Sequence, residues 1–175
     1  MWQHLEKCGS AADEAYKNMI MVTLGTGVGG GILINGKILT GEHGAGGEIG
    51  HLCVNYEETD NCGCGNHGCL EQYASATGIT RLAKKKLDST DRETLLRKGP
   101  VNAKTVFDAV KAGDEVADEI AVEFGTYLGH ALANLAAAVD PAAIVIGGGV
   151  SKAGEVLLPY IKSHIRRERF LLTAT

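Results

Sequence analysis

Residues 41–71 read GEHGAGGEIGHLCVNYEETDNCGCGNHGCLE, and this stretch, rich in glycine and cysteine, decides how the rest of the chain is interpreted. Cys62, Cys64 and Cys69 fall within eight positions, and His51 precedes the first of them by ten intervening residues. This spacing is typical of a metal site and not of core packing. We therefore expect a bound metal to order a loop that would otherwise be flexible.

Zinc is the expected metal, because three thiolates and one imidazole make a closed tetrahedral site that supports folding and leaves no position for a catalytic water. His51 is the preferred fourth ligand, and His43, His67 and Cys53 compete with it on position alone. The order C-x-C-x₄-C differs from the paired C-x₂-C of a zinc ribbon, which argues against a nucleic-acid finger. Free or oxidised thiols are the alternative.

Two glutamates, Glu48 and Glu71, flank the cysteines. A pair of carboxylates can serve acid/base chemistry or hydrogen-bond a polyol. Glutamates beside glycines are more often simply solvated, so from these residues alone the solvated state is favoured.

The composition limits the class of protein. A chain of 175 residues that is 45% hydrophobic can bury one domain-sized core, so we expect one globular domain or a fragment of a larger fold. The net charge of −4 offers no electrostatic footprint for nucleic acid. No apolar run is long enough for a membrane span and no signal peptide is apparent, and the crowded cysteines fit a reducing compartment, so we expect a soluble cytoplasmic protein without a membrane partner.

A glycine-rich turn follows the apolar run Met19–Leu24, which we expect to be a buried strand. The turn formally contains G-x-G-x-x-G, but the fingerprint requires a helix immediately afterwards. Instead, Asn35-Gly36 between apolar runs predicts a type I′ hairpin. A turn that carries Thr26 can still offer backbone N–H groups to a phosphate, although a tight hairpin without a ligand is an equal alternative.

Periodicity predicts the remaining elements. Gly125 and Gly129 interrupt the longest helix, so we expect a closely packed neighbour there. Three glycines, Gly147 to Gly149, exceed what a strand-to-helix turn needs, which favours nucleotide contact, and Ser151 is placed to cap the next helix. In order, the expected elements are a helix and turn over 1–18, a helix from 70, a polar mobile connection over 88–100, a helix over 103–112, a helix over 114–139, a strand over 142–146, a helix from 151 and the start of a strand at 170–173.

Four motifs in order resemble those of the ROK family of sugar kinases and sugar-responsive repressors, most closely its bacterial glucokinases. They are TLGTGVGGG at Thr23–Gly31, the ExGH motif at Glu48–His51, CGCGNHGCLE at Cys62–Glu71 and IVIGGGV at Ile144–Val150. The resemblance implies an α/β, actin-like, hexokinase-type ATPase fold of two lobes. Residues 1–175 would be mostly the C-terminal lobe with its zinc-binding loop at 41–71, and the N-terminal lobe would be absent.

The resemblance also implies roles for the loop residues. Glu48, His51 and Glu71 would bind sugar hydroxyls, and His51 would share a structural zinc with the three cysteines Cys62, Cys64 and Cys69. One imidazole nitrogen would face the metal and the other the sugar, so the metal would orient a group that binds substrate.

The nucleotide would be ATP with Mg²⁺. Thr26 and Gly27 match the family positions that contact its phosphates, and Gly147, Gly148 and Gly149 match the turn on the adenosine side. Phosphoryl transfer depends on positioning and charge neutralisation, for which a glycine cradle and magnesium are suited.

Two features of the family are missing from this sequence: the DxGGT-like strand at its start, and an Asn-Asp pair whose aspartate is the base for the sugar hydroxyl. The base would lie upstream of Met1, so we assign no catalytic residue, and the family's final strand and helix would follow Thr175. We therefore expect these 175 residues alone to be inactive.

The leading hypothesis is that the parent protein, expected to be a homodimer, phosphorylates glucose to glucose 6-phosphate. A kinase for N-acetylmannosamine, N-acetylglucosamine or fructose is the nearest alternative, because the sugar-contact residues are shared broadly. A sugar-sensing repressor with DNA-binding helices upstream is another, although the intact TLGTGVGGG favours retained use of ATP. A stand-alone, zinc-stabilised binding module is the third.

Overall fold

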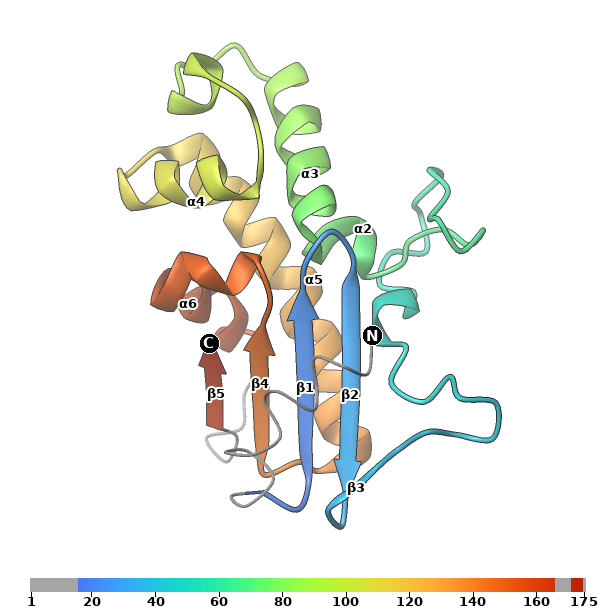
Figure 1. The fold of residues 1–175 in the computed structure, drawn as a ribbon. Coiled ribbons are helices and arrows are strands. Elements are labelled where there is room, and N and C mark those ends of the chain that lie inside the picture. Colours follow the sequence, from blue (N-terminus) through green and yellow to red (C-terminus); the bar gives the residue numbers. More distant parts are fainter. Residues whose placement is uncertain (1–15, 166–170, 175) are drawn as a thin grey trace.

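The computed structural model describes residues 16–165 and 171–174, and a five-stranded sheet lies at its centre (Figure 1). The strand order is β3-β2-β1-β4-β5. Neighbours β1, β2 and β3 pair antiparallel, whereas β4 pairs parallel with β1 and with β5. The strands are β1 (Met19–Leu24), β2 (Val28–Ile34), β3 (Lys37–Ile38), β4 (Ala143–Gly147) and β5 (Leu171–Ala174).

The predicted strands and hairpin are confirmed. Asn35 and Gly36 both have positive φ, 53° and 74°, as a type I′ turn requires. The strand expected at the end of the chain is β5, which finds its partner in β4. The helix expected within residues 1–18 falls almost entirely outside the described residues.

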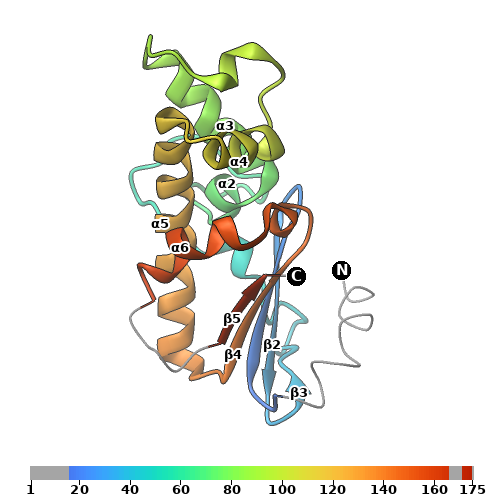
Figure 2. The same cartoon turned by 90° about the vertical axis from the view of Figure 1, so that its left-hand side faces the viewer.

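One long helix, α5 (Glu115–Val139), lies along one face of the sheet (Figure 2). Side chains alternate across a strand, so Ile20, Val22 and Leu24 point into the main core with α5, and Met19 and Met21 pack on the other face. The remaining helices are α2 (Glu71–Ala74), α3 (Ala76–Asp88), α4 (Ala103–Lys111) and α6 (Leu158–Lys162), with short 3-10 helices at Ile49–His51, Leu95–Lys98 and Val150–Leu157.

Gly125 and Gly129 face a close neighbour, as expected. A Cβ added to Gly125 would lie 2.5 Å from the Cβ of Tyr160, and one added to Gly129 would lie 2.7 Å from the Cβ of His164. The two glycines therefore let α5 approach α6 and the residues after it more closely than any side chain would allow.

Two local predictions need correction. Residues 88–100 are not a mobile connection: they contain the end of α3 and a 3-10 helix at Leu95–Lys98. Leu96 of this helix is buried in the core and holds the segment against the protein. Ser151 does not cap a helix: its hydroxyl donates to the Gly148 carbonyl at 2.7 Å. The expected helix is instead a 3-10 segment, interrupted at Gly154 (φ 81°), followed by the short α6.

None of the helices within the described ranges combines the length and the apolar character that crossing a membrane requires.

Candidate functional site

The two glycine turns leave the same edge of the sheet. Strands β1 and β4 run parallel with Thr23 opposite Gly147, so both turns follow the carboxyl ends of neighbouring strands. Gly148 has φ +95°, and a Cβ there would lie 2.6 Å from the Leu24 carbonyl oxygen, so only glycine fits. The crevice beyond the carboxyl ends of parallel strands is where α/β sheets commonly bind ligands.

The segment that carries Glu48 and His51 crosses directly over β2. A Cβ on Gly30 would lie 2.5 Å from Cγ1 of the buried Ile49, and a Cβ on Gly50 would lie 2.1 Å from the Val28 carbonyl oxygen. Glycines in β2 and in the crossing segment therefore allow the two backbones to lie in direct contact. Glu48 and His51 remain exposed above the strand.

Glu71 connects the first glycine turn to the cysteines. Its Oε2 accepts a hydrogen bond from the Val28 backbone N–H at 3.2 Å, and its Oε1 accepts from the Cys62 thiol at 3.7 Å. A Cβ on Gly27 would lie 2.2 Å from Glu71 Oε2, so this contact requires glycine at position 27. The sequence alone gave no sign of the Val28 contact, because residues 28 and 71 meet only through the fold.

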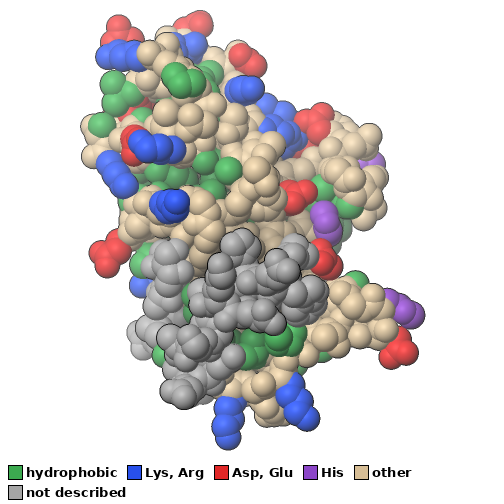
Figure 3. All heavy atoms as spheres, in the orientation of Figure 1, with side chains coloured by type: hydrophobic (Ala, Val, Ile, Leu, Met, Phe, Trp, Pro, Cys, Tyr) green, Lys and Arg blue, Asp and Glu red, His purple; other side chains and the backbone are tan. Residues whose placement is uncertain are grey.

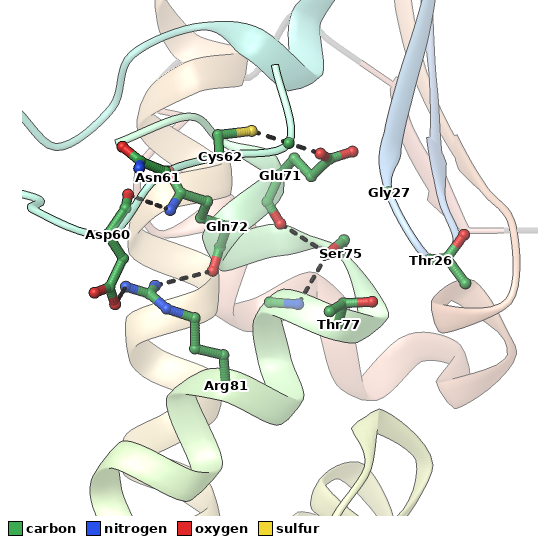
Figure 4. A pocket seen from close by; sticks show the side chains of 12 residues that line it. Thr26, Gly27, Asp60, Asn61, Cys62, Glu71, Gln72, Ser75, Thr77 and Arg81 are labelled. Atoms are coloured by element: carbon green, nitrogen blue, oxygen red, sulfur yellow. Dashed lines mark hydrogen bonds and ion pairs between the residues drawn. The ribbon is translucent and has the colours of Figure 1, made fainter. Parts of the chain in front are cut away.

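A cavity of about 440 Å³ lies between the first glycine turn, residues 52–70, which we call the cysteine loop, and α2 with α3 (Figure 4). Two candidate nucleotide residues, Thr26 and Gly27, and one candidate sugar residue, Glu71, are in its wall. Glu48 and His51 do not line it. The full lining is Thr26, Gly27, Asp60, Asn61, Cys62, Gly63, Glu71, Gln72, Ser75, Thr77, Gly78 and Arg81.

The structure brings the four candidate metal ligands together: one donor atom from each of His51, Cys62, Cys64 and Cys69 lies within 4.8 Å of the others. His51 Nδ1 is 3.9 Å from Cys62 Sγ, and Cys64 Sγ is 3.6 Å from Cys69 Sγ. Thiolates bound tetrahedrally to zinc at about 2.3 Å would be separated by about 3.8 Å. The donor set and its spacing therefore fit zinc.

Without a metal, the surroundings of two of the three thiols favour the neutral form. Burial, with the neighbouring thiols, raises the pKa of Cys69 to about 12, and burial raises the pKa of Cys62. A hydrogen bond from the backbone of Asn66 is the main cause of the lowered pKa of Cys64. A coordinated metal would favour the thiolate form of all three.

The competing ligands lie elsewhere. His67 Nδ1 is 3.1 Å from Asn61 Oδ1, and neither His67 nor the exposed Cys53 belongs to the close group of donors. His43 is in the exposed loop that precedes Glu48. That loop and the cysteine loop both project from one side of the molecule, where histidine side chains gather (Figure 3).

A partly buried polar network attaches the cysteine loop to α2 and α3, and sequence reasoning missed it. Glu58 accepts hydrogen bonds from the Tyr73 hydroxyl at 2.6 Å and from Arg81 at 2.5 Å. Burial alone would raise the pKa of Glu58, but these bonds lower it to about 2. No spacing rule connects positions 58, 73 and 81, so the sequence carried no signal for this contact.

Comparison with known proteins places these features in a family. The sequence profile of the ROK family matches residues 6–171. The chain is 50% identical over 157 residues to a glucokinase from Halalkalibacterium halodurans. The aligned segment covers 87% of this chain and 48% of that protein.

Two solved structures have the same fold. A ROK family glucokinase from Streptomyces griseus, in complex with glucose and AMPPNP, has a TM-score of 0.81 and 35% identity, covering 91% of this chain and 56% of that one. A ROK family transcriptional regulator, a homologue of the E. coli MLC protein, has a TM-score of 0.81 and 28% identity, covering 99% of this chain and 46% of that one.

The chain spans about half the length of the curated relatives it matches. Its mixed α/β architecture and its structural neighbours give it the actin-like ATPase fold of the ROK sugar kinases. Because the family profile extends over residues 6–171, with the glycine turns and the cysteine loop inside it, this chain belongs to the ROK family.

Proposed function

We propose that the full-length protein containing this chain transfers the terminal phosphoryl group of ATP to the 6-hydroxyl of glucose. The observation that carries the proposal is the shared wall of one cavity, where the turn residues Thr26 and Gly27 meet Glu71. A sugar held by Glu71 would lie next to phosphates held by the turn, as in-line transfer requires. The glucokinase relatives support glucose as the sugar.

We assign sugar binding to Glu48, His51 and Glu71. Glu71 is oriented by the Val28 N–H, so its carboxylate is held in place as a hydrogen-bond acceptor for a hydroxyl. His51 directs Nδ1 toward the cysteines, which leaves Nε2 free to contact a sugar hydroxyl. These residues position substrate and do not exchange protons with it.

We assign a structural zinc to His51, Cys62, Cys64 and Cys69. The metal would hold the thiolates together and fix the imidazole of His51, and with four protein ligands it would leave no position for a catalytic water. Zinc therefore acts on the sugar only through the orientation of His51.

We assign the ATP phosphates to the backbone N–H groups of the Thr26–Gly27 turn and the adenosine side to Gly147–Gly149. Magnesium bound with ATP would neutralise charge on the phosphates. The two turns lie side by side at the carboxyl ends of β1 and β4, which supports one nucleotide contacting both.

The base that removes the proton from the sugar hydroxyl is not expected among the cavity carboxylates. Asp60 is paired with Arg81 at 2.7 Å and Lys85 at 3.0 Å, and hydrogen bonds from both lower its pKa. The Glu71 carboxylate accepts a hydrogen bond from the Val28 backbone N–H. We propose that these residues form the C-terminal lobe and that the base is an aspartate of the other lobe.

The test is a coupled assay of ADP release by the full-length protein with glucose, N-acetylmannosamine, N-acetylglucosamine and fructose. We expect kcat/KM for glucose to exceed the others by about tenfold or more, a difference of about 1.4 kcal/mol. Glu48→Gln should raise the KM for glucose by about tenfold while kcat changes less. Glu42→Gln, on an exposed residue of the same loop, is the matched control. Equal KM values for glucose in the two variants would refute the assignment of Glu48.

A sugar-responsive repressor is the second candidate, because the transcriptional regulator covers 99% of this chain. Specific binding of the full-length protein to duplex DNA, released by a sugar and without ATP turnover, would favour it over the kinase.

A further inference from the structure

Gln72 follows Glu71 on α2, and its side chain is buried, with the residue only 9% exposed. Its Oε1 accepts a hydrogen bond from the Cys69 backbone N–H at 3.0 Å, and its Nε2 donates to the Asp60 carbonyl oxygen at 2.9 Å. Figure 4 shows the side chain reaching Asp60 at the wall of the cavity. One helix side chain thus connects two loop positions that are well separated in sequence.

These two positions are the ends of a small hairpin, residues 60–69, which we call the cysteine hairpin. Asn61 and His67 face each other across it in an antiparallel bridge. The hairpin carries two of the four candidate zinc ligands between its ends and a third, Cys69, at one end. Gln72 therefore fixes the separation of the ends that bound the ligand cluster.

The ion pairs that attach the hairpin to α3 reach one end only. Lys85 Nζ lies 3.0 Å from Asp60 Oδ2, and both side chains are more than half exposed. Arg81 contacts the same carboxylate at 2.7 Å. Among the side chains that the structure describes, Gln72 alone hydrogen-bonds to both ends of the cysteine hairpin.

We propose that Gln72 is a positioning residue that holds the cysteine hairpin in a shape ready for the metal before the metal binds. This inference rests on the proposed zinc site. Cys69 is fully buried, so removal of the Gln72 amide leaves its N–H without a partner and without water, which forces the hairpin to rearrange. Loss of an outer contact that orients a ligand typically weakens metal binding by about 10- to 100-fold.

The test compares Gln72→Met with Lys85→Met in the full-length protein. Both variants remove a contact to Asp60, but only the first removes the buried contact to Cys69. Zinc release to a chromogenic chelator should be about tenfold faster in Gln72→Met. In Lys85→Met it should change by less than about twofold, because exposed ion pairs contribute little. The cobalt-substituted Gln72→Met protein should also show an altered thiolate-to-metal charge-transfer band.

A kinetic readout separates positioning from general destabilisation. Because the hairpin orients His51 through the metal, Gln72→Met should raise the KM for glucose by about threefold or more with kcat changed less than about twofold. Gln72→Glu, which keeps an acceptor for the Cys69 N–H, should have a smaller effect and serves as the second variant if Gln72→Met does not fold.

Equal zinc release in Gln72→Met and Lys85→Met would overturn the proposal. If the wild-type protein holds no zinc, the metal assignment fails, and hydrogen exchange of residues 60–69 in the metal-free protein then tests the role of Gln72 separately. Faster exchange in Gln72→Met than in wild type would support the positioning role, and identical exchange would overturn it.

Discussion

The sheet with α5 and the cysteine loop are ordered by different forces. In the sheet and α5, buried apolar side chains such as Ile20, Ile144 and Leu128 supply the stability. Between Glu48 and Glu71 few large apolar side chains are buried. Polar contacts of Glu58 and Gln72 attach the loop to the helices, and the proposed zinc would add to them. Disruption of one region should therefore leave much of the other intact.

The largest expected effect is on the loop. Cys69→Ser should reduce the zinc content of the protein from about one per chain to near zero, because oxygen replaces one of only four donors. The helical circular dichroism should stay near the wild-type value, since α5 and α3 contain no ligand. Metal analysis and limited proteolysis within residues 55–68 measure the two outcomes. Loss of helical signal together with zinc would show that the two regions are not separate.

The next largest effect breaks the other region. Phe124 is fully buried and contacts Phe107 edge to face, with ring centroids 5.6 Å apart. Phe124→Ala should lower the free energy of unfolding by about 3–5 kcal/mol, measured with urea. Zinc content of the folded protein should be unchanged. A variant that loses zinc while still folded would contradict the comparison.

The smallest expected effect is a pH-dependent change in stability at Glu58, in the cysteine loop. Glu58 has a folded pKa of about 2, below its usual 4.5, so the unfolded chain binds more protons between these values. Its contribution is complete above about pH 4.5 and is lost as the pH falls toward 2. Glu58→Gln should cost about 1–3 kcal/mol at pH 6, less at pH 3. The measurement is urea unfolding of metal-free protein at both values, and a constant difference would argue against the ion pair.

Much of the fold and of the candidate metal site could be predicted from the sequence, because the sequence signals for them are local. Met19–Leu24 is an apolar run, Asn35-Gly36 accepts the two positive φ angles of its turn, and residues 114–139 repeat with helical period. The cluster of Cys62 and its partner thiols is likewise local in spacing, so their proximity in space was expected. The capping signal at Ser151 predicted a helix that does not form. Gly154, three residues later, has a positive φ of 81° that interrupts the helical backbone.

The sequence by itself determined most of the strands and helices, the glycine turns and the candidate ligands, because these depend mainly on neighbours in the chain. Only the tertiary structure decided which distant groups meet: Glu71 with the Val28 N–H, Glu58 with Arg81, and Gln72 with both ends of the cysteine hairpin. These contacts are single hydrogen bonds between positions with no shared period. They form where the packed core holds β2, the loop and α2 together, because a hydrogen bond needs donor and acceptor held at the right distance and angle.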